Sequence, residues 1–151
     1  PKLIERTGTG TESEGTITAF YTVLAEGDDL NDPIVDIARA SLDGQIALSR
    51  ELADQGHFPA IDLVGSVSRL MPVLASDEQI ENALRFRKVW STYQENKELV
   101  QVGAYQRGSD HHMDTALRTI TQITDFLTQK MSEASSAEQS MTALRELIHE
   151  F

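Results

Sequence analysis

The segment GHFPAIDLVGSVSRLM, residues 56–71, decides how this chain is interpreted. It places an aromatic residue, Phe58, directly before a proline and a single arginine, Arg69, near its end. The segment is rich in Gly, Pro, Ser and Asp and has no sustained helical or strand period, so we predict an ordered loop. An aromatic ring can stack on a base, and a guanidinium can neutralise phosphoryl charge. Composition alone favours structural roles instead, with Phe58 in a core gap and Arg69 bound to a carbonyl or an acid.

Upstream of this segment, strand-like and helix-like stretches alternate. TITAFYTVLA, residues 16–25, is β-branched, aromatic and almost continuously apolar, which predicts a buried strand of a parallel sheet. Asp32 as N-cap and Pro33 at the first helical position predict a helix that continues over residues 34–42. The segment that follows this helix, GQIALSRELADQG, predicts a second short strand and then a short helix closed by Gly56.

Downstream of residue 72 the pattern becomes helical. Ser76 and Gln79 have the spacing of a capping box, and the amphipathic helix that follows ends at Gly103. After the turn GAYQRGSD, apolar side chains recur every three or four positions as far as Leu127, which predicts a second helix.

A third helix closes the sequence. It follows the break SEASS, and Ser135 with Glu138 offers its capping box. The change of pattern divides the chain into an α/β part, residues 1–72, and an all-helical part, residues 73–151. Two strands and a helix do not complete a parallel sheet, so we expect the first part to be the end of a larger domain.

The composition excludes several classes of function. With 13 basic and 24 acidic residues in 151, the net charge of -11 argues against a nucleic-acid or anionic-membrane surface. The absence of cysteine excludes disulfides and thiol nucleophiles and fits the cytoplasm. No apolar run approaches the roughly 20 residues of a membrane span. The start, PKLIERTG, is neither a signal nor a transit peptide, and its lack of an initial Met predicts a fragment or a processed chain.

Three stretches that look like ligand motifs have simpler interpretations. GTGTESEG, residues 8–15, lacks the lysine of a phosphate-binding loop and is interpreted as a solvated loop. The acids in residues 26–32 suit a hard cation, but a solvated turn with a helix cap explains them better. The run Asp-His-His, residues 110–112, is favoured as a helix start. We therefore predict no metal site.

Several separated blocks resemble the flagellar and type III secretion export ATPases, which are relatives of the catalytic subunit of rotary ATP synthases. The blocks are TITAFYTVLAEGDDLNDPIVDIARA, LDGQIALSREL, HFPAIDLVGSVSRLM and YQENKELVQVGAYQRGSD, and the resemblance covers about residues 1–130. It implies an α+β fragment: the end of a RecA-like P-loop ATPase domain, residues 1–72, and a C-terminal helical domain, residues 73–151. The family's Walker A and B motifs and catalytic Glu are expected upstream of this chain.

The resemblance implies roles for single residues. Phe58 matches the aromatic, commonly Tyr, that lies against the adenine ring in its own subunit. Arg69 matches the arginine finger, which acts in trans on the γ-phosphoryl group of the neighbouring subunit and is worth about 10³–10⁵ in rate in GTPases. Gln45 stands where many members have His, and Phe126 is the nearest candidate for a second adenine-pocket aromatic.

Two surfaces are candidate partner contacts by resemblance. Asp28, Asp29 and Asn31 correspond to an acidic loop that faces the central stalk inside the ring. Tyr105 and Arg107 lie in the turn between the first two helices, on the side where stalk and chaperones engage. The alternatives are a solvated turn for the first set and an ordinary exposed turn for the second.

The resemblance implies a hexameric export ATPase that uses ATP and magnesium at the cytoplasmic face of the export apparatus, peripheral to the membrane only through partners. Its partners would be the stalk, chaperones, export substrates and the export gate, with no nucleic acid. LVQVGAYQRGSD favours a flagellar over an injectisome member. The chain alone is expected to be inactive. A subunit of a proton-translocating rotary ATPase and a non-enzymatic helical interaction module stay open as alternatives.

Overall fold

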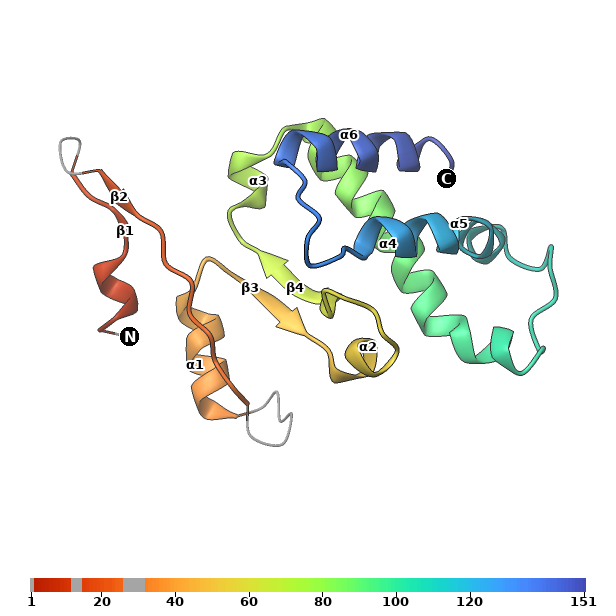
Figure 1. Ribbon diagram of the computed structural model, residues 1–151, viewed down its shortest axis with the longest axis horizontal. Coiled ribbons are helices and arrows are strands. Elements are labelled where there is room, and N and C mark those ends of the chain that lie inside the picture. Colours follow the sequence, from red (N-terminus) through yellow and green to blue (C-terminus); the bar gives the residue numbers. More distant parts are fainter. Residues whose placement is uncertain (1, 12–14, 26–31) are drawn as a thin grey trace. The chain divides into compact units, whose positions relative to one another are not determined.

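The computed structural model describes residues 2–11, 15–25 and 32–151. The chain divides into two compact units, Pro1–Gln45 and Ile46–Phe151. Figure 1 shows the elements in chain order. Within the described ranges, no helix combines the length and the apolar character needed to cross a membrane.

The first unit has little regular structure besides one helix. Its elements are a 3-10 turn η1 (Ile4–Arg6), the antiparallel strands β1 (Gly8–Thr9) and β2 (Thr16–Ile17), and the helix α1 (Pro33–Ser41). The predicted buried strand over residues 16–25 is wrong, because regular structure ends at Ile17, and Phe20 and Leu24 are each 88% exposed. A strand needs a neighbour for its backbone hydrogen bonds, and the described residues supply one only for Thr16 and Ile17.

The start of α1 confirms the predicted helix signal. Asp32 Oδ1 accepts hydrogen bonds from the amides of Ile34 at 2.7 Å and Val35 at 3.4 Å. Pro33 occupies the first turn, where its missing N–H leaves no gap in the hydrogen bonding.

The β part of the second unit follows the predicted strand and helix and adds a strand that the sequence did not predict. β3 (Gly44–Leu48) pairs with β4 (Ile61–Ser68), and α2 (Arg50–Asp54) lies between them in the chain. The predicted ordered loop over residues 56–71 is therefore wrong for most of its length, and it ends in a short helix, α3 (Met71–Leu74).

The loop signal was misleading because the Asp, Gly and Ser residues form a bend inside β4 instead of ending it. Ser66 Oγ donates to the carbonyl of Asp62 at 2.6 Å, although four residues of extended strand span about 13 Å. Asp62 Oδ1 in turn accepts from the amides of Val64 and Gly65, at 2.9 and 3.0 Å. A Cβ on Gly65 would lie 2.6 Å from Asp62 Oδ2, so any other residue there would displace the Asp62 carboxylate.

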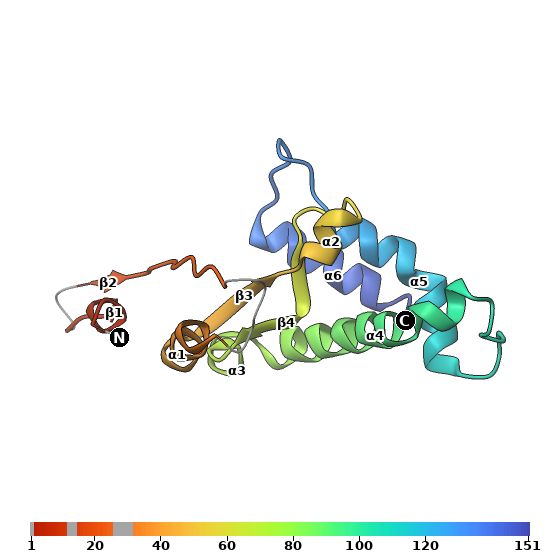
Figure 2. The ribbon, with the colours of Figure 1, turned by 90° about the horizontal axis from the view of Figure 1, so that it is seen from below.

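Three helices form the rest of the second unit. α5 (His111–Leu127) and α6 (Ala137–Ile148) lie on one side of the long helix α4 (Asp77–Gln101), as Figure 2 shows. Their core contains two aromatic residues of α4 and three aliphatic residues of α5 and α6: Phe86, Trp90, Ile123, Leu147 and Ile148. The predicted all-helical bundle is confirmed.

The helix caps agree with the sequence with one exception. Ser76 and Gln79 form the predicted capping box at α4, with bonds of 3.3 and 2.8 Å. At α6 the box is formed by Ser136 and Gln139, so the predicted pair Ser135 and Glu138 is wrong by one position. Both pairs have the required spacing, and the apolar face of a helix fixes its rotation but not the residue at which its first turn begins.

Candidate functional site

Phe58 lies in the link between α2 and β4 and presents its ring on a fixed backbone. The residue is 55% exposed, so it does not fill a gap in the core. Its carbonyl oxygen accepts a 2.8 Å hydrogen bond from the amide of Gln129, which follows α5. An exposed ring whose main chain is held in place suits stacking against a flat heterocycle, because little order is lost on binding.

The residue before Phe58 also anchors this link. His57 is only 8% exposed, and its ring lies 6.1 Å from that of Trp90 in α4. Its amide donates to the carbonyl of Leu52 at 2.9 Å. The sequence analysis assigned no role to His57 or Gln129. The only signals in the sequence were that His57 directly precedes the aromatic Phe58 and that Gln129 follows the end of a predicted helix.

Phe126 packs on the helical core. Its ring meets that of Phe86 edge to face, with centroids 5.4 Å apart and an interplanar angle of 67°. This partly buried position gives Phe126 a structural role in the bundle.

Arg69 follows the last residue of β4 and is exposed. The chain turns into α3 directly after it, where Ser68 Oγ accepts from the amide of Met71 at 3.2 Å. Arg69 and Phe58 therefore lie beyond opposite ends of β4 in the chain, one after it and one before it.

The turn between α4 and α5 is folded onto the start of α5. The Tyr105 hydroxyl lies 2.9 Å from Asp114 Oδ1 and 3.0 Å from the carbonyl oxygen of Asp110, so these two acceptors share its single proton. The amide of Gly108 donates to the other carboxylate oxygen of Asp114 at 2.8 Å. Partial burial raises the pKa of Tyr105, and the Asp114 carboxylate acts in the same direction. Arg107 is exposed on this turn.

Asp110 caps α5, as the sequence predicted. Its Oδ1 accepts from the amides of Met113 at 3.1 Å and His112 at 2.7 Å. These two hydrogen bonds favour the carboxylate and lower the pKa of Asp110. Among the residues that the structure describes, no three metal-ligating side chains gather into a cluster.

The three predicted stalk contacts, Asp28, Asp29 and Asn31, lie outside the described residues.

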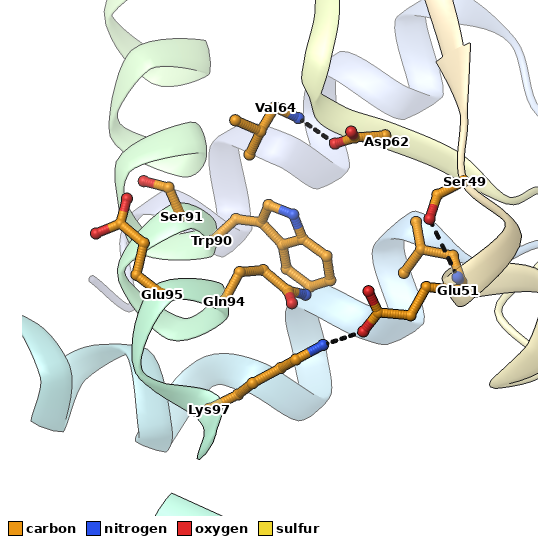
Figure 3. Close-up of a pocket in the computed structure, with 10 residues that line it drawn as sticks. Ser49, Glu51, Asp62, Val64, Trp90, Ser91, Gln94, Glu95 and Lys97 are labelled. Atoms are coloured by element: carbon orange, nitrogen blue, oxygen red, sulfur yellow. Dashed lines mark hydrogen bonds and ion pairs between the residues drawn. The ribbon is translucent and has the colours of Figure 1, made fainter. Parts of the chain in front are cut away.

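A cavity of about 300 Å³ lies between α2, β4 and α4 (Figure 3). The Trp90 side chain and the Asp62 carboxylate contribute to its wall. Lys97 and Glu51 form an ion pair at one side, and this hydrogen bond and the charge of Lys97 lower the pKa of Glu51. The sequence did not predict this cavity, because its residues come from three separated segments.

Two family models match the chain in succession. Residues 1–68 match the nucleotide-binding domain of the ATP synthase alpha/beta family, and residues 75–146 match the C-terminal domain of the T3SS EscN ATPase. The fold is therefore the C-terminal region of a RecA-like ATPase followed by its helical domain, as the sequence predicted.

Curated relatives and solved structures give the same answer. The flagellum-specific ATP synthases of Pseudomonas aeruginosa and Salmonella typhimurium are 47% and 49% identical over 98% and 95% of this chain. The SPI-2 type 3 secretion system ATPase of Salmonella typhimurium is 45% identical over 99% of it. The chain covers 33%, 32% and 34% of these three proteins, so it spans about a third of their length.

Among solved structures, the assembled ATPase EscN of the enteropathogenic E. coli type III secretion system matches with a TM-score of 0.93 and 40% identity over 98% of this chain and 35% of its own. EscN in complex with its central stalk EscO matches with a TM-score of 0.87 and 38% identity, over 98% of this chain and 34% of its own. The chain is thus a homologue of the flagellum-specific ATP synthases and type III secretion ATPases.

Proposed function

We propose that this chain is the C-terminal part of an ATP-hydrolysing export ATPase, called the parent protein below, that powers or primes type III protein export. The observation that carries the proposal is identity of 45–49% with flagellar and secretion ATPases over nearly the whole chain. The segment LVQVGAYQRGSD supports flagellar assembly over an injectisome.

The proposed domains are residues 1–72, the end of the catalytic domain, and residues 73–151, the helical domain. The family-model matches support this division, because one stops at residue 68 and the other begins at residue 75.

Phe58 is proposed to stack on the adenine ring of ATP in its own subunit. The exposed ring fits this role, because the hydrogen bond from Gln129 and the buried His57 hold its backbone while its face stays accessible. Magnesium, held by upstream residues of the parent protein, would neutralise phosphate charge. The chain has no G-x-x-x-x-G-K-[ST] motif, so residues 1–151 alone are expected to neither bind ATP tightly nor hydrolyse it.

Arg69 is proposed to act as an arginine finger in trans. Its guanidinium would stabilise the charge that develops on the γ-phosphoryl group in the neighbouring subunit. Support comes from its exposed position directly after β4, beyond the opposite end of that strand from Phe58. A finger in trans requires a ring, so the parent protein is proposed to be a homo-hexamer.

The proposed partners of this ring are a central stalk protein, export chaperones, export substrates and the export gate, at the cytoplasmic face of the export apparatus. EscN, a structural neighbour, is solved in complex with its central stalk EscO, which supports a stalk partner. Asp28, Asp29, Asn31, Tyr105 and Arg107 are the proposed contacts.

Export itself tests the function. Deletion of the gene for the parent protein should abolish export of flagellar filament protein into the medium, and the wild-type gene should restore it. The Arg69→Ala gene should not restore export although it produces a protein of normal abundance. Flagellar export that persists in the deletion strain while injectisome export is lost would move the assignment to the injectisome.

A further inference from the structure

Arg87 on α4 contacts the main chain of β4. Its Nη2 atom donates hydrogen bonds to the carbonyl oxygens of Val64 and Ser66, the second at 3.1 Å. Both acceptors are backbone atoms, so the contact fixes the course of the strand itself. A guanidinium suits this task, because it offers several donors in one plane and its charge strengthens each hydrogen bond.

The contact falls on the bend of β4. Inside the bend, the Asp62 carboxylate accepts hydrogen bonds from the amides of Val64 and Gly65, and the Ser66 hydroxyl donates to the Asp62 carbonyl. The same hydroxyl accepts from the amide of Ala47 in β3 at 3.0 Å. These bonds hold the bend from within the β part, whereas Arg87 holds it from the helical bundle.

The bend is also close in sequence to the end of the strand. Ser66, which accepts from Arg87, lies three residues before Arg69. On the helix side, Arg87 directly follows Phe86 of the core cluster, against which Leu63 of β4 packs. Hydrogen bonds from Arg87 and the packing of Leu63 therefore both join the bundle to the strand that precedes Arg69.

We propose that Arg87 is a positioning residue for Arg69. This inference rests on the proposed function, in which Arg69 acts on the nucleotide of the neighbouring subunit. Arg87 holds the bend of β4 and so determines the position of the Arg69 guanidinium.

The variant Arg87→Met tests the contact in the chain of residues 1–151. It keeps an unbranched side chain and removes every donor, and Arg85→Met is its matched control because Arg85 is exposed two residues earlier on the same helix. Amides of residues 64–68 should exchange with deuterium about tenfold faster in Arg87→Met, because their local opening becomes easier. Arg85→Met should exchange as the wild type does. If Arg87→Met does not fold by circular dichroism, Arg87→Gln takes its place.

The same variants in the parent protein test the positioning role. Arg87→Met should lower kcat by about tenfold and leave KM for ATP unchanged, because it acts on transition-state charge and not on substrate binding. Arg87→Lys should recover part of kcat, and Arg85→Met should keep all of it. A merely structural role would instead lower the amount of folded protein and would not separate kcat from KM.

The outcomes separate this inference from the proposed function. Unchanged exchange at residues 64–68 in Arg87→Met overturns the contact. A wild-type kcat in Arg87→Met, when Arg69→Ala is inactive, overturns the positioning role and leaves the function of Arg69 intact. Full activity of Arg69→Ala overturns the arginine-finger assignment, and the positioning role of Arg87 falls with it.

Discussion

The hydroxyl of Tyr105 donates to the carboxylate of Asp114 at 2.9 Å, and this pair holds the turn between α4 and α5 against the start of α5. Tyr105 was predicted as a partner contact, but its polar group is already used within the fold. Arg107, exposed on the same turn, is the better test of partner binding.

We predict that Arg107→Ala weakens binding of the cognate stalk protein without changing the melting temperature of residues 1–151. The expected loss is about 1–2 kcal/mol, the range of an interface arginine of ordinary importance. Isothermal titration calorimetry with the stalk protein measures it. Tyr105→Phe is the companion variant: it removes the bond to Asp114 and should lower the melting temperature. Stalk affinity that Arg107→Ala leaves intact would return the turn to an ordinary exposed loop.

We predict that Phe58→Ala in the parent protein weakens adenine nucleotide binding by about 1 kcal/mol, through the loss of aromatic stacking. Phe58→Tyr should be nearly neutral, because it keeps the ring. Phe58→Leu is the control for apolar bulk and should resemble Ala if the π face matters. Equilibrium titration with ATP measures all three, and equal affinity in Phe58→Ala and wild type would assign the ring a purely structural role.

We predict that Arg69→Ala lowers turnover of the parent ring by about 10³-fold or more while nucleotide affinity stays near normal. In mixed rings, an Arg69→Ala subunit should silence the site of its neighbour. Subunits with Arg69→Ala and subunits without the Walker lysine should therefore restore part of the activity when mixed. Some sites then receive the Walker lysine from the Arg69→Ala subunit and Arg69 from its neighbour. ATPase rates across mixing ratios measure this, and a strictly proportional loss with no complementation would argue for action in cis.

We predict a pH-dependent contribution of Asp110 to the stability of residues 1–151. Its pKa is lowered in the folded chain, so its contribution is complete above the unfolded pKa of about 3.9 and is lost as pH falls through the folded pKa. Asp110→Asn keeps a capping oxygen but does not titrate. Wild type should melt higher than Asp110→Asn at pH 7, and the difference should close below pH 4.

Asp125→Asn, an exposed change in the same helix α5, is the control for this pH series. A difference between wild type and Asp110→Asn that stays constant from pH 7 to pH 3 would show that the caps differ in geometry and not in charge.

The sequence predicted the helices well, because helix signals are local. Asp32, Ser76 and Asp110 cap the helices that they were expected to start, since a cap depends on the next three residues alone. It failed for residues 16–25 and for β4. A strand depends on distant partners, and the polar residues of β4 bond within the strand itself.

The candidate site divides in the same way. Phe58 and Arg69 lie in one segment, and the resemblance to export ATPases gave them the roles that are proposed above. Gln129, which bonds to Phe58, follows α5 and lies 71 positions further along the chain, and Arg87, which bonds to the bend before Arg69, lies in α4, 18 positions after Arg69. No sequence pattern distinguishes either residue from other surface side chains, so only the structure brings them to the site.

Because His57 contacts Trp90, the intrinsic fluorescence of Trp90 reports on the structure around this contact. Trp90 is the only tryptophan in the sequence, so its emission arises from the junction between the helical core and the link that carries Phe58. Its indole lines a cavity that solvent can enter, and its spectrum will respond to a change in that link as well as to loss of the core. The fluorescence of unlabelled protein can thus report both events. A change in the link shifts the emission spectrum of Trp90, and loss of the core gives the emission of an exposed indole.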